Sequence, residues 1–269
     1  MGKLKQTNNT TIDKFIKYIK KIFNKEVRFR LLVISVVLIC CLLFLYITGI
    51  IWVGEISHRI YPIQGVDVSH YQGNIDWDVL SKENISFAYI KATEGSSTKD
   101  ERFEYNWNEA SKTDLRIGAY HFFSFDSEGE TQADNFIETV PVTEDALPPV
   151  IDFEFYGDKK SNKPDYDKTI KELEVIIKRL KEHYGKTPVI YCTYSTYIDY
   201  IDGNFNDCPL WIRNTHYKPG IFDNIEWTFW QYTGEGRKEG YDGKDTIYDN
   251  EENIDINIFN GNEKEFREF

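Results

Sequence analysis

The sequence of 269 residues is poor in cysteine and histidine, the residues that form disulfide bonds and bind zinc. It contains four cysteines and five histidines, and Cys40 and Cys41 lie within an uncharged apolar stretch. The histidines show no metal-ligand spacing with each other or with the cysteines, so we expect no metal site and no other cofactor. For Cys192 and Cys208, a disulfide bond and two buried thiols both remain open.

The chain beyond residue 53 also lacks positive charge. The whole chain has a net charge of −12, although residues 1–30 contain nine Lys or Arg against Asp13 and Glu26, a net +7. Residues 31–53 carry no charge, so residues 54–269 carry −19. Nucleic acids bind to clustered Lys and Arg, so we expect no nucleic-acid partner. The content of 41% apolar and 28% charged residues excludes a disordered acidic chain and a protein with many membrane spans.

Residues 31–53 form one long apolar run without a charged residue. These 23 residues, at roughly 1.5 Å each, match the thickness of a bilayer core, which predicts a transmembrane helix. A cleaved signal peptide is the alternative, but the run is longer than such peptides need and lacks an A-x-A-like cleavage site. Because the basic residues precede the run, the positive-inside rule predicts a cytoplasmic N-terminus and an extracytoplasmic remainder.

We therefore expect a basic cytoplasmic segment at 1–30, a membrane helix at 31–53, a short linker at 54–63 and one domain at 64–269. From residue 65, short β-branched and aromatic runs alternate with amphipathic stretches, a pattern typical of βα units around a parallel sheet. Strands are predicted at 65–69, 87–92, 116–122, 149–155, 188–192, 210–213, 226–232 and 254–258, and helices at 76–82, 102–113, 129–140 and 166–184. The last three strands lack long helices between them. This predicts an α/β barrel that becomes irregular and more nearly antiparallel in its last third.

Polar residues occur at the carboxyl ends of the predicted strands, where a barrel of this type carries its chemistry. They are Asp67, Glu94, His121, Asp152, Glu154, Trp230, Gln231, Tyr232 and Asp255. Each also has a structural interpretation, since an aspartate can cap a turn, a glutamate can be solvated and a histidine can be a hydrogen-bonded core residue. The functional interpretation depends on their occurring together.

Asp152 and Glu154, in the segment VIDFEF, give the strongest of these signals. Alternation along a strand directs both carboxylates into the barrel, about 6.5–7 Å apart, and directs Phe153 to the helix-covered face. Burying carboxylates without partners raises their pKa values or destabilises the fold, so a chain with several at one rim is expected to use them. Such a cluster can keep one carboxylic acid protonated for donation to a leaving oxygen, which favours glycoside hydrolysis.

Eight sequence blocks, in this order, resemble those of the lysozymes of glycoside hydrolase family 25. The blocks are GVDVSHYQGNIDW, FAYIKATEGSSTKD, IGAYHFF, VIDFEF, VIYCTYS, PLWIRN, WQYTGEG and IDINIFNG. The resemblance covers about residues 64–261 and implies hydrolysis of the β-1,4 bond from N-acetylmuramic acid to N-acetylglucosamine in peptidoglycan. It also implies a flattened, TIM-like (β/α)5(β)3 barrel. The partners would then be peptidoglycan glycan strands and, through residues 31–53, a membrane; no obligate protein partner is evident.

By position, the resemblance assigns the general acid to Glu154 and the steering of the substrate's 2-acetamido group to Asp152. In that scheme the acetamide oxygen attacks the anomeric carbon with retention of configuration, so Glu154 is protonated when substrate binds and Asp152 stays ionised. Asp67, Glu94 and Asp255 match the family's other acidic positions. The expected substrate-binding residues are Tyr120, His121, Tyr191, Trp211, Trp230, Gln231 and Tyr232, because aromatic faces suit pyranose rings.

Two positions depart from the family pattern. Asn84 stands in place of a glycine, and it tolerates the left-handed conformation; Thr98 stands in place of an aromatic residue or Leu. None of the five acids is replaced, which favours an active enzyme. The alternatives are a membrane-tethered, catalytically weak peptidoglycan-binding protein and a chitinase-like or hexosaminidase-like glycosidase. Wall remodelling, secretion, DNA transfer and attack on competitors all need the same chemistry, so the sequence does not choose among these roles.

Overall fold

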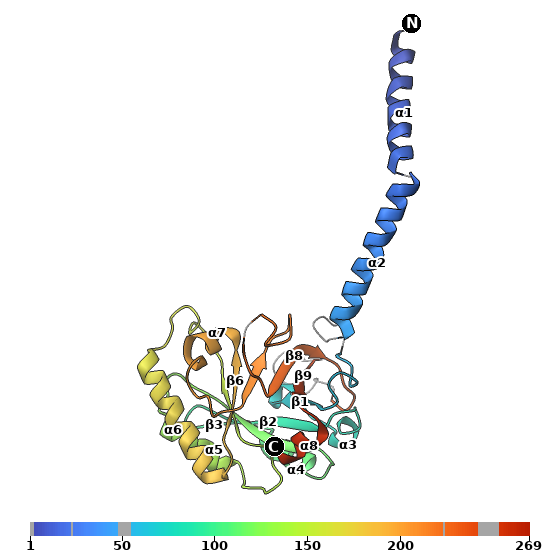
Figure 1. Cartoon of the computed structure of the whole chain (residues 1–269). Helices are drawn as coiled ribbons and strands as arrows, with labels where there is room; N and C mark the ends of the chain where they lie inside the picture. Colours follow the sequence, from blue (N-terminus) through green and yellow to red (C-terminus); the bar gives the residue numbers. More distant parts are fainter. Residues whose placement is uncertain (1–2, 23, 48–54, 223, 242–252) are drawn as a thin grey trace. The chain divides into compact units, whose positions relative to one another are not determined.

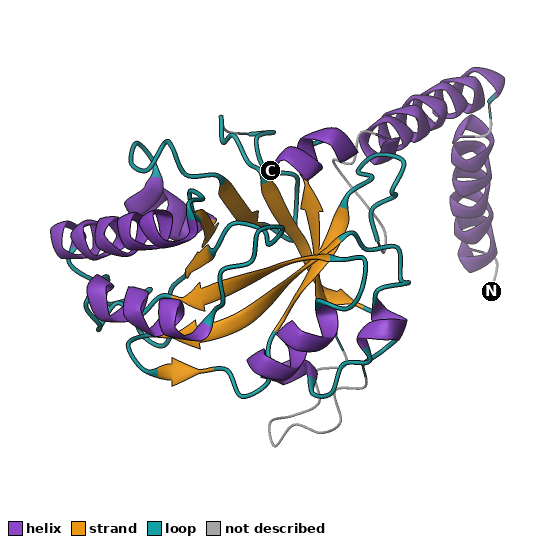
Figure 2. Ribbon diagram, turned by 90° about the horizontal axis from the view of Figure 1, so that it is seen from below, coloured by secondary structure: helices purple, strands orange, loops and turns teal. Residues whose placement is uncertain are grey.

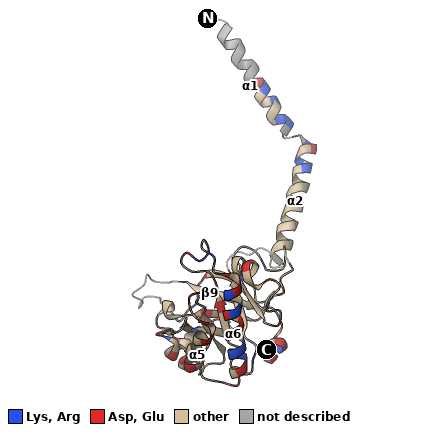
Figure 3. Ribbon diagram, turned by 90° about the vertical axis from the view of Figure 1, so that its left-hand side faces the viewer, with Lys and Arg blue, Asp and Glu red and all other residues tan. Residues whose placement is uncertain are grey.

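The computed structural model describes residues 3–22, 24–47, 55–222, 224–241 and 253–269, and the chain divides into two units, Met1–Ile50 and Ile51–Phe269 (Figure 1). The first unit contains α1 (Lys3–Ile22) and α2 (Lys25–Ile47). By length and composition, the segment Lys25–Tyr46 is able to cross a membrane, and it is the one such helix in the described residues. Basic residues occur on α1 and at the start of α2 and not farther along α2 (Figure 3). Residues 48–53 of the predicted span lie outside the described residues.

The second unit is a closed barrel of eight strands, which are drawn in orange in Figure 2. The strands are β1 (Gln64–Val68), β2 (Phe87–Glu94), β4 (Arg116–Phe122), β5 (Val150–Phe153), β6 (Val189–Thr193), β7 (Leu210–Arg213), β8 (Phe229–Gly236) and β9 (Ile254–Phe259). β1 pairs with both β2 and β9, and these two pairings close the sheet. A ninth strand, β3 (Thr98–Lys99), extends the sheet only at the end of β2. The predicted α/β barrel is confirmed.

The direction of the last strands differs from the prediction. Every neighbouring pair from β1 to β8 around the barrel is parallel, and β9 is antiparallel to both β8 and β1. The expected antiparallel character of the last third is therefore correct for the β8–β9 and β9–β1 pairs and wrong for the β7–β8 pair. Two parallel neighbours in a sheet need a connection of about a dozen residues or more, but this connection need not contain a helix. Residues 214–228 form the connection between β7 and β8.

Helices cover the outside of the barrel. They are α3 (Trp77–Leu80), α4 (Phe103–Ala110), α5 (Gly129–Thr139) and α6 (Tyr166–Tyr184), with the short η1 (His70–Gln72), α7 (Tyr194–Thr196) and η2 (Tyr197–Ile201) in loops. α6 has the predicted bounds because its ends are capped: the Asp165 side chain accepts a hydrogen bond from Lys168 N, and Gly185 has a left-handed φ of 69°. Its buried face, which includes Leu173 and Leu180, packs against the barrel.

Aromatic side chains fill the end of the barrel at which the parallel strands begin. The ring centroid of Phe87 lies 5.3 Å from that of Phe229 and 5.6 Å from that of Phe266. Phe266 belongs to α8 (Glu263–Glu268), a helix that the sequence did not predict, and its side chain is buried in the barrel interior. Since apolar rings occupy this end, the interior is left to polar groups only at the opposite end, where the parallel strands finish.

The segment 55–63, expected as a linker, packs on the barrel instead. Ile56 is buried in the core outside the sheet, and its N–H donates to Tyr232 Oη at 3.2 Å. The Gln64 side chain donates to Ile56 O at 2.8 Å. The segment is too short to give a clear periodic signal, so the boundary was placed at the first strand. The folded domain begins before residue 64.

Local structure answers two smaller questions. Cys192 and Cys208 are buried free thiols, so the disulfide alternative is wrong. Asn84 has a φ of 55°, the left-handed conformation that asparagine was expected to tolerate at this position.

Candidate active site

A cavity of about 440 Å³ opens where the parallel strands end. It is lined by Asp67, Val68, Ser69, Tyr71, Gln72, Lys91, Tyr120, Phe122, Val150, Asp152, Glu154, Tyr191, Trp211, Arg213, Gln231 and Asp255. The set contains four of the five expected acids and four of the seven expected substrate-binding residues. Within the described residues, no group of His, Cys, Asp and Glu is arranged to hold a metal ion.

β5 brings Asp152 and Glu154 to the cavity. Asp152 lies on the strand and Glu154 directly follows it, and both side chains line the cavity. Ile151 and Phe153 are fully buried on the other face, in the core between sheet and helices. This is the alternation that the segment VIDFEF predicts, and it places two carboxylates side by side at one point of the barrel rim.

Asp67 is held by a chain of side-chain hydrogen bonds across the barrel. Its Oδ2 accepts from Gln231 Nε2 at 2.9 Å and from Asn257 Nδ2 at 2.7 Å. Gln231 Oε1 in turn accepts from Tyr191 Oη at 3.0 Å, and Asn257 Oδ1 accepts from Trp211 Nε1 at 3.0 Å. The network fixes the Asp67 carboxylate, and it explains why Tyr191 and Trp211 face inward with their polar atoms satisfied.

Asp255 enters the cavity from the antiparallel strand. In the β1–β9 pairing it lies opposite Asp67, so two acids face one another across neighbouring strands. Gly234 approaches it from β8: a Cβ atom at this position would lie 2.9 Å from Asp255 Oδ1. A larger residue at 234 would therefore displace the carboxylate.

The carboxyl pKa values of Asp67, Asp152 and Glu154 are raised above their ordinary values, with burial as the largest cause for each. The charge of Glu154 raises the pKa of Asp152 further, whereas Arg213 opposes the rise for Glu154. Asp152 therefore holds a proton more readily than the sequence-based expectation of an ionised group allows. The two neighbouring acids titrate as a pair, and a proton is retained on the pair above the ordinary carboxyl range.

One oxygen of Asp152 has no hydrogen-bond donor. Its Oδ1 is buried, and no donor from the described residues reaches it. Buried polar atoms are nearly always hydrogen-bonded, so an orphaned acceptor that faces a cavity marks a point where a bound molecule can supply the donor.

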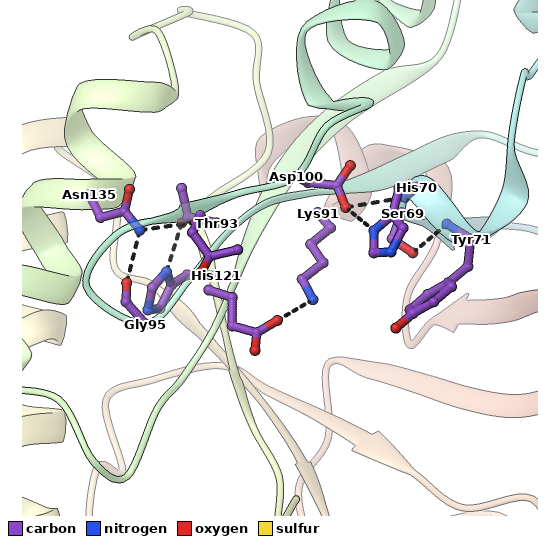
Figure 4. A network of polar contacts seen from close by, with 11 residues as sticks. Ser69, His70, Tyr71, Lys91, Thr93, Gly95, Asp100, His121 and Asn135 are labelled. Atoms are coloured by element: carbon purple, nitrogen blue, oxygen red, sulfur yellow. Dashed lines mark hydrogen bonds and ion pairs between the residues drawn. The ribbon is translucent and has the colours of Figure 1, made fainter. Parts of the chain in front are cut away.

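Two cationic residues that line the cavity were not predicted from the sequence. Lys91 Nζ lies 2.8 Å from Glu94 Oε2 (Figure 4), and its charge lowers the pKa values of Asp152 and Glu154. Arg213, at the end of β7, lowers those of Glu154 and Asp67. The signal that could have found both is alternation, because Lys91 is two residues from the inward-facing Tyr89 and Arg213 is two residues from Trp211.

Glu94 does not line the cavity. The β2–β4 register shifts between Lys91 and Thr93, so a bulge interrupts the alternation near the end of β2. Thr93 then faces outward, and Glu94 lies at the rim with 45% of its side chain exposed, paired with Lys91. The bulge could not be read from the sequence.

Three expected substrate-binding residues face away from the cavity. His121 is buried beneath α5, with Nδ1 2.7 Å from Thr93 Oγ1 (Figure 4) and Nε2 3.1 Å from Gln132 Oε1. Burial lowers the pKa of His121 to about 4, so this imidazole is neutral near pH 7. Trp230 and Tyr232 lie in the outer core with hydrogen-bonded polar atoms. Each of these three residues is next to one that faces inward, and alternation along a strand directs adjacent side chains to opposite faces of the sheet.

A turn after β1 supplies a further aromatic residue. Asp100 Oδ2 accepts from His70 N at 3.1 Å and lies 2.7 Å from His70 Nδ1, which fixes η1 to the end of β3 (Figure 4). The Tyr71 ring packs on the His70 ring with centroids 4.1 Å apart and lines the cavity. Tyr71 remains 40% exposed, so its ring can contact a bound molecule at the rim.

The chain is similar to several known proteins. A family 25 glycosyl hydrolase structure from Bacillus anthracis has 49% identity, covers 80% of this chain and 96% of that chain, and gives a TM-score of 0.72. The structure of a bacterial lysozyme from Streptomyces coelicolor has 31% identity and a TM-score of 0.65, covering 76% of this chain and 95% of that one. Lysozyme M1 from Streptomyces globisporus is 34% identical over 215 residues, which cover 74% of this chain and 68% of that protein.

Residues 66–241 also match a family described as Glycosyl hydrolases family 25. The match runs from β1 past the end of β8 and so includes Asp67, Asp152, Glu154 and both cations of the cavity. Asp255 lies beyond it, on the strand that closes the barrel. Because this match covers more than half of the chain, the chain belongs to family 25 of the glycosyl hydrolases.

Proposed function

We propose that the protein is a muramidase, which hydrolyses the β-1,4 bond from N-acetylmuramic acid to N-acetylglucosamine in peptidoglycan. Family membership and the similarity to lysozymes of Streptomyces support this reaction. The observation that carries the proposal is the pair on β5: two neighbouring acids share one ring-lined cavity, and Asp152 presents an acceptor without a donor from the described chain.

Glu154 acts as the general acid in this proposal. Burial and the charge of Asp67 raise its pKa, which lets it keep a proton for the leaving oxygen of N-acetylglucosamine. Once the proton has moved, Arg213 and Lys91 stabilise the carboxylate that remains, because both cations favour its charged form. The O–H bond of Glu154 breaks as the glycosidic C–O bond breaks, so no free alkoxide has to leave.

Asp152 positions the internal nucleophile. The acetamide N–H of muramic acid donates to Asp152 Oδ1, and the acetamide oxygen then attacks the anomeric carbon on the face opposite the leaving group. Accepting this hydrogen bond favours the ionised form of Asp152, so substrate binding moves the retained proton toward Glu154. Water then attacks the anomeric carbon of the resulting oxazolinium ion and gives a proton to the Glu154 carboxylate, which opens the ring, restores the acid and retains configuration overall.

The rings of the cavity supply platforms for the sugars. Tyr71 lies at the rim, and Tyr120, Tyr191 and Trp211 line the interior. Pyranose rings present apolar C–H faces that pack on aromatic rings, while their hydroxyl groups bond to the surrounding acids. Asp67 and Asp255 accept hydrogen bonds from the sugar hydroxyl groups. Their negative charge also stabilises the positive charge that develops at the anomeric carbon.

We also propose that α2 anchors the enzyme in a membrane, with the N-terminus in the cytoplasm and the barrel outside. The support is the length and composition of Lys25–Tyr46, together with the basic residues of α1 and the start of α2. The domain organisation proposed in this way is a basic segment, one span and an extracytoplasmic barrel. Tethering would hold the enzyme near its substrate without a separate wall-binding module.

End-group analysis tests the proposed reaction. The purified protein is expected to release new reducing ends of muramic acid from peptidoglycan and to leave chitin intact. Reducing ends of N-acetylglucosamine would instead indicate a chitinase-like or hexosaminidase-like enzyme. Binding of glycan strands without any new reducing end would indicate a binding protein and contradict the proposal.

A further inference from the structure

A second cavity, of about 820 Å³, adjoins the active-site cavity. Arg213 lines both cavities. Their walls meet again where Gly234 of the second cavity faces Asp255 of the first, close enough that a Cβ on Gly234 would lie 2.9 Å from the carboxylate. Arg213 and the approach of Gly234 to Asp255 are therefore the boundary that the two cavities share.

One wall of the adjoining cavity is a free strand edge. β7 pairs with β8 only as far as Arg213, which lies opposite Gln231. β8 continues to Gly236 with β9 on its other side, and residues 233–236 line the adjoining cavity. No strand in the described chain pairs with residues 233–236 on the β7 side. The N–H of Glu235 donates to Thr233 Oγ1 at 3.0 Å, and the other backbone groups of this edge can pair with an extended peptide.

The adjoining cavity is also less acidic than the domain around it. Arg213 and Arg237 line it, and neither forms a salt bridge with another described residue. Of its two acids, Glu55 is paired with Lys238 Nζ at 2.8 Å, which leaves Glu235 exposed at the surface. In a region with a net charge of −19, these two guanidinium groups next to the active site are a local exception that suits carboxylate groups, although Arg213 also acts on Glu154.

The adjoining cavity lacks the platforms that a sugar needs. Its aromatic lining consists of Tyr232, which is buried in the outer core, and the imidazole of His216, whereas several larger rings line the active site. Threonine, glycine, arginine and backbone atoms form most of the remaining surface. Such a surface suits an anionic peptide better than another pyranose ring.

We propose that the adjoining cavity binds the peptide stem of the muramic acid residue, with stem carboxylates on Arg237 and Arg213 and the stem backbone along residues 233–236. The inference rests on the proposed muramidase function. A muramidase reacts at C1 of muramic acid, so this ring lies against Asp152 and Glu154, and its stem leaves from C3 of the same ring. Extended stem residues span about 3.5 Å each, so two or three of them extend roughly 7–10 Å from the ring.

Two substrates that differ only in the stem test this proposal. Glycan strands of matched length are prepared with intact stems and with stems removed by an amidase, and kcat/KM is measured for each. The wild type is expected to prefer the stem-bearing strands roughly tenfold, the scale of one charge-assisted hydrogen bond. Arg237→Gln should lose most of this preference. Arg267→Gln, which removes an exposed arginine from α8 at the opposite end of the barrel, should keep it.

Chemical modification of the stem carboxylates provides a second test of the proposal. Strands whose stem carboxylates have been converted to amides should react with the wild type about as slowly as intact strands react with Arg237→Gln. Equal kcat/KM for stem-bearing and stripped strands in the wild type would overturn the proposal. So would an equal loss of both activities in Arg237→Gln, because that would make the adjoining cavity a sugar subsite. In either case, release of muramic acid ends from stripped strands would leave the muramidase function standing.

Discussion

Two cations, Lys91 and Arg213, lie among the four carboxylates that line the active site. Their placement matters because each buried acid would otherwise hold its proton too tightly to transfer it. Lys91 lowers the pKa values of both Asp152 and Glu154, and its own charge is balanced at the rim by Glu94. The acid–base range of the enzyme is therefore set by the balance between burial, which raises these pKa values, and the two cations.

Lys91→Met should move the pH profile of kcat/KM toward higher pH. Without this charge the pKa values of Asp152 and Glu154 both rise, so the ascending and descending limbs shift in the same direction, by roughly half a unit or more. Lys91→Arg keeps the charge and should keep the profile near that of the wild type. An unchanged profile for Lys91→Met would show that Lys91 does not act on the pair.

Asp152→Asn should stabilise the domain at neutral pH. Because the pKa of Asp152 is raised in the folded state, the native protein binds more protons than the unfolded chain, and stability falls as pH rises above about 4. Asparagine does not ionise, so the variant does not lose this stability as the pH rises. Thermal melts should show a Tm a few degrees above that of the wild type at pH 7 and no gain at pH 3, while turnover falls sharply. A lower Tm at pH 7 would contradict the assignment.

At the residue scale, strand alternation makes some of the site predictable and some not. It places Asp152 and Glu154 inside the barrel and, applied to the neighbouring segments, would also have placed Lys91 inside and His121 outside. The position of Glu94 was not predictable in this way, because the bulge in β2 depends on how that strand pairs with β4.

At the scale of elements, the best predicted segments are those whose ends carry a local signal. Residues 166–184 are a helix between a capping Asp165 and a left-handed Gly185, and residues 116–122 and 210–213 have the predicted strand bounds. α8 was missed because six residues give too little periodicity, and its stability comes from one buried ring. The direction of β7 and β8 was missed because a loop, rather than a helix, makes the crossover.

Phe266→Ala in α8 should destabilise the domain by about 3 kcal/mol, since it removes a buried ring that contacts Phe87 and Phe259. Urea denaturation measures this loss. Turnover per folded molecule should stay unchanged because α8 lies at the end of the barrel opposite the active site. Phe222→Ala is the matched control: that ring is 76% exposed, and its removal should cost little. Equal effects of the two changes would contradict the packing described for α8.

At the scale of the whole molecule, charge and hydropathy separate two functions along the chain. Residues 1–30 are basic, residues 31–53 are uncharged and the remainder is strongly acidic. This order matches a chain that is held at a membrane by its first unit and that acts on an external polymer with its second. The acidic surface also argues against adhesion to anionic lipid, so the anchor would be the main membrane contact.

Protease added to spheroplasts should degrade the barrel and spare a tag at the N-terminus, because the basic residues before the span keep that end in the cytoplasm. Immunoblots for the tag and for the barrel report the two fates. Permeabilised spheroplasts, in which both parts are cleaved, serve as the control. Protection of the barrel in intact spheroplasts would reverse the proposed orientation.

The most direct test of the proposed muramidase mechanism is the activity of Glu154→Gln on two substrates. On peptidoglycan, turnover should fall by about 100-fold or more, because the leaving sugar oxygen then departs without a proton. On an aryl glycoside of N-acetylmuramic acid, whose good leaving group needs no proton, much of the activity should remain, whereas Asp152→Asn should lose activity on both. Equal loss on both substrates by Glu154→Gln, with Asp152→Asn largely active, would contradict the roles assigned to the pair.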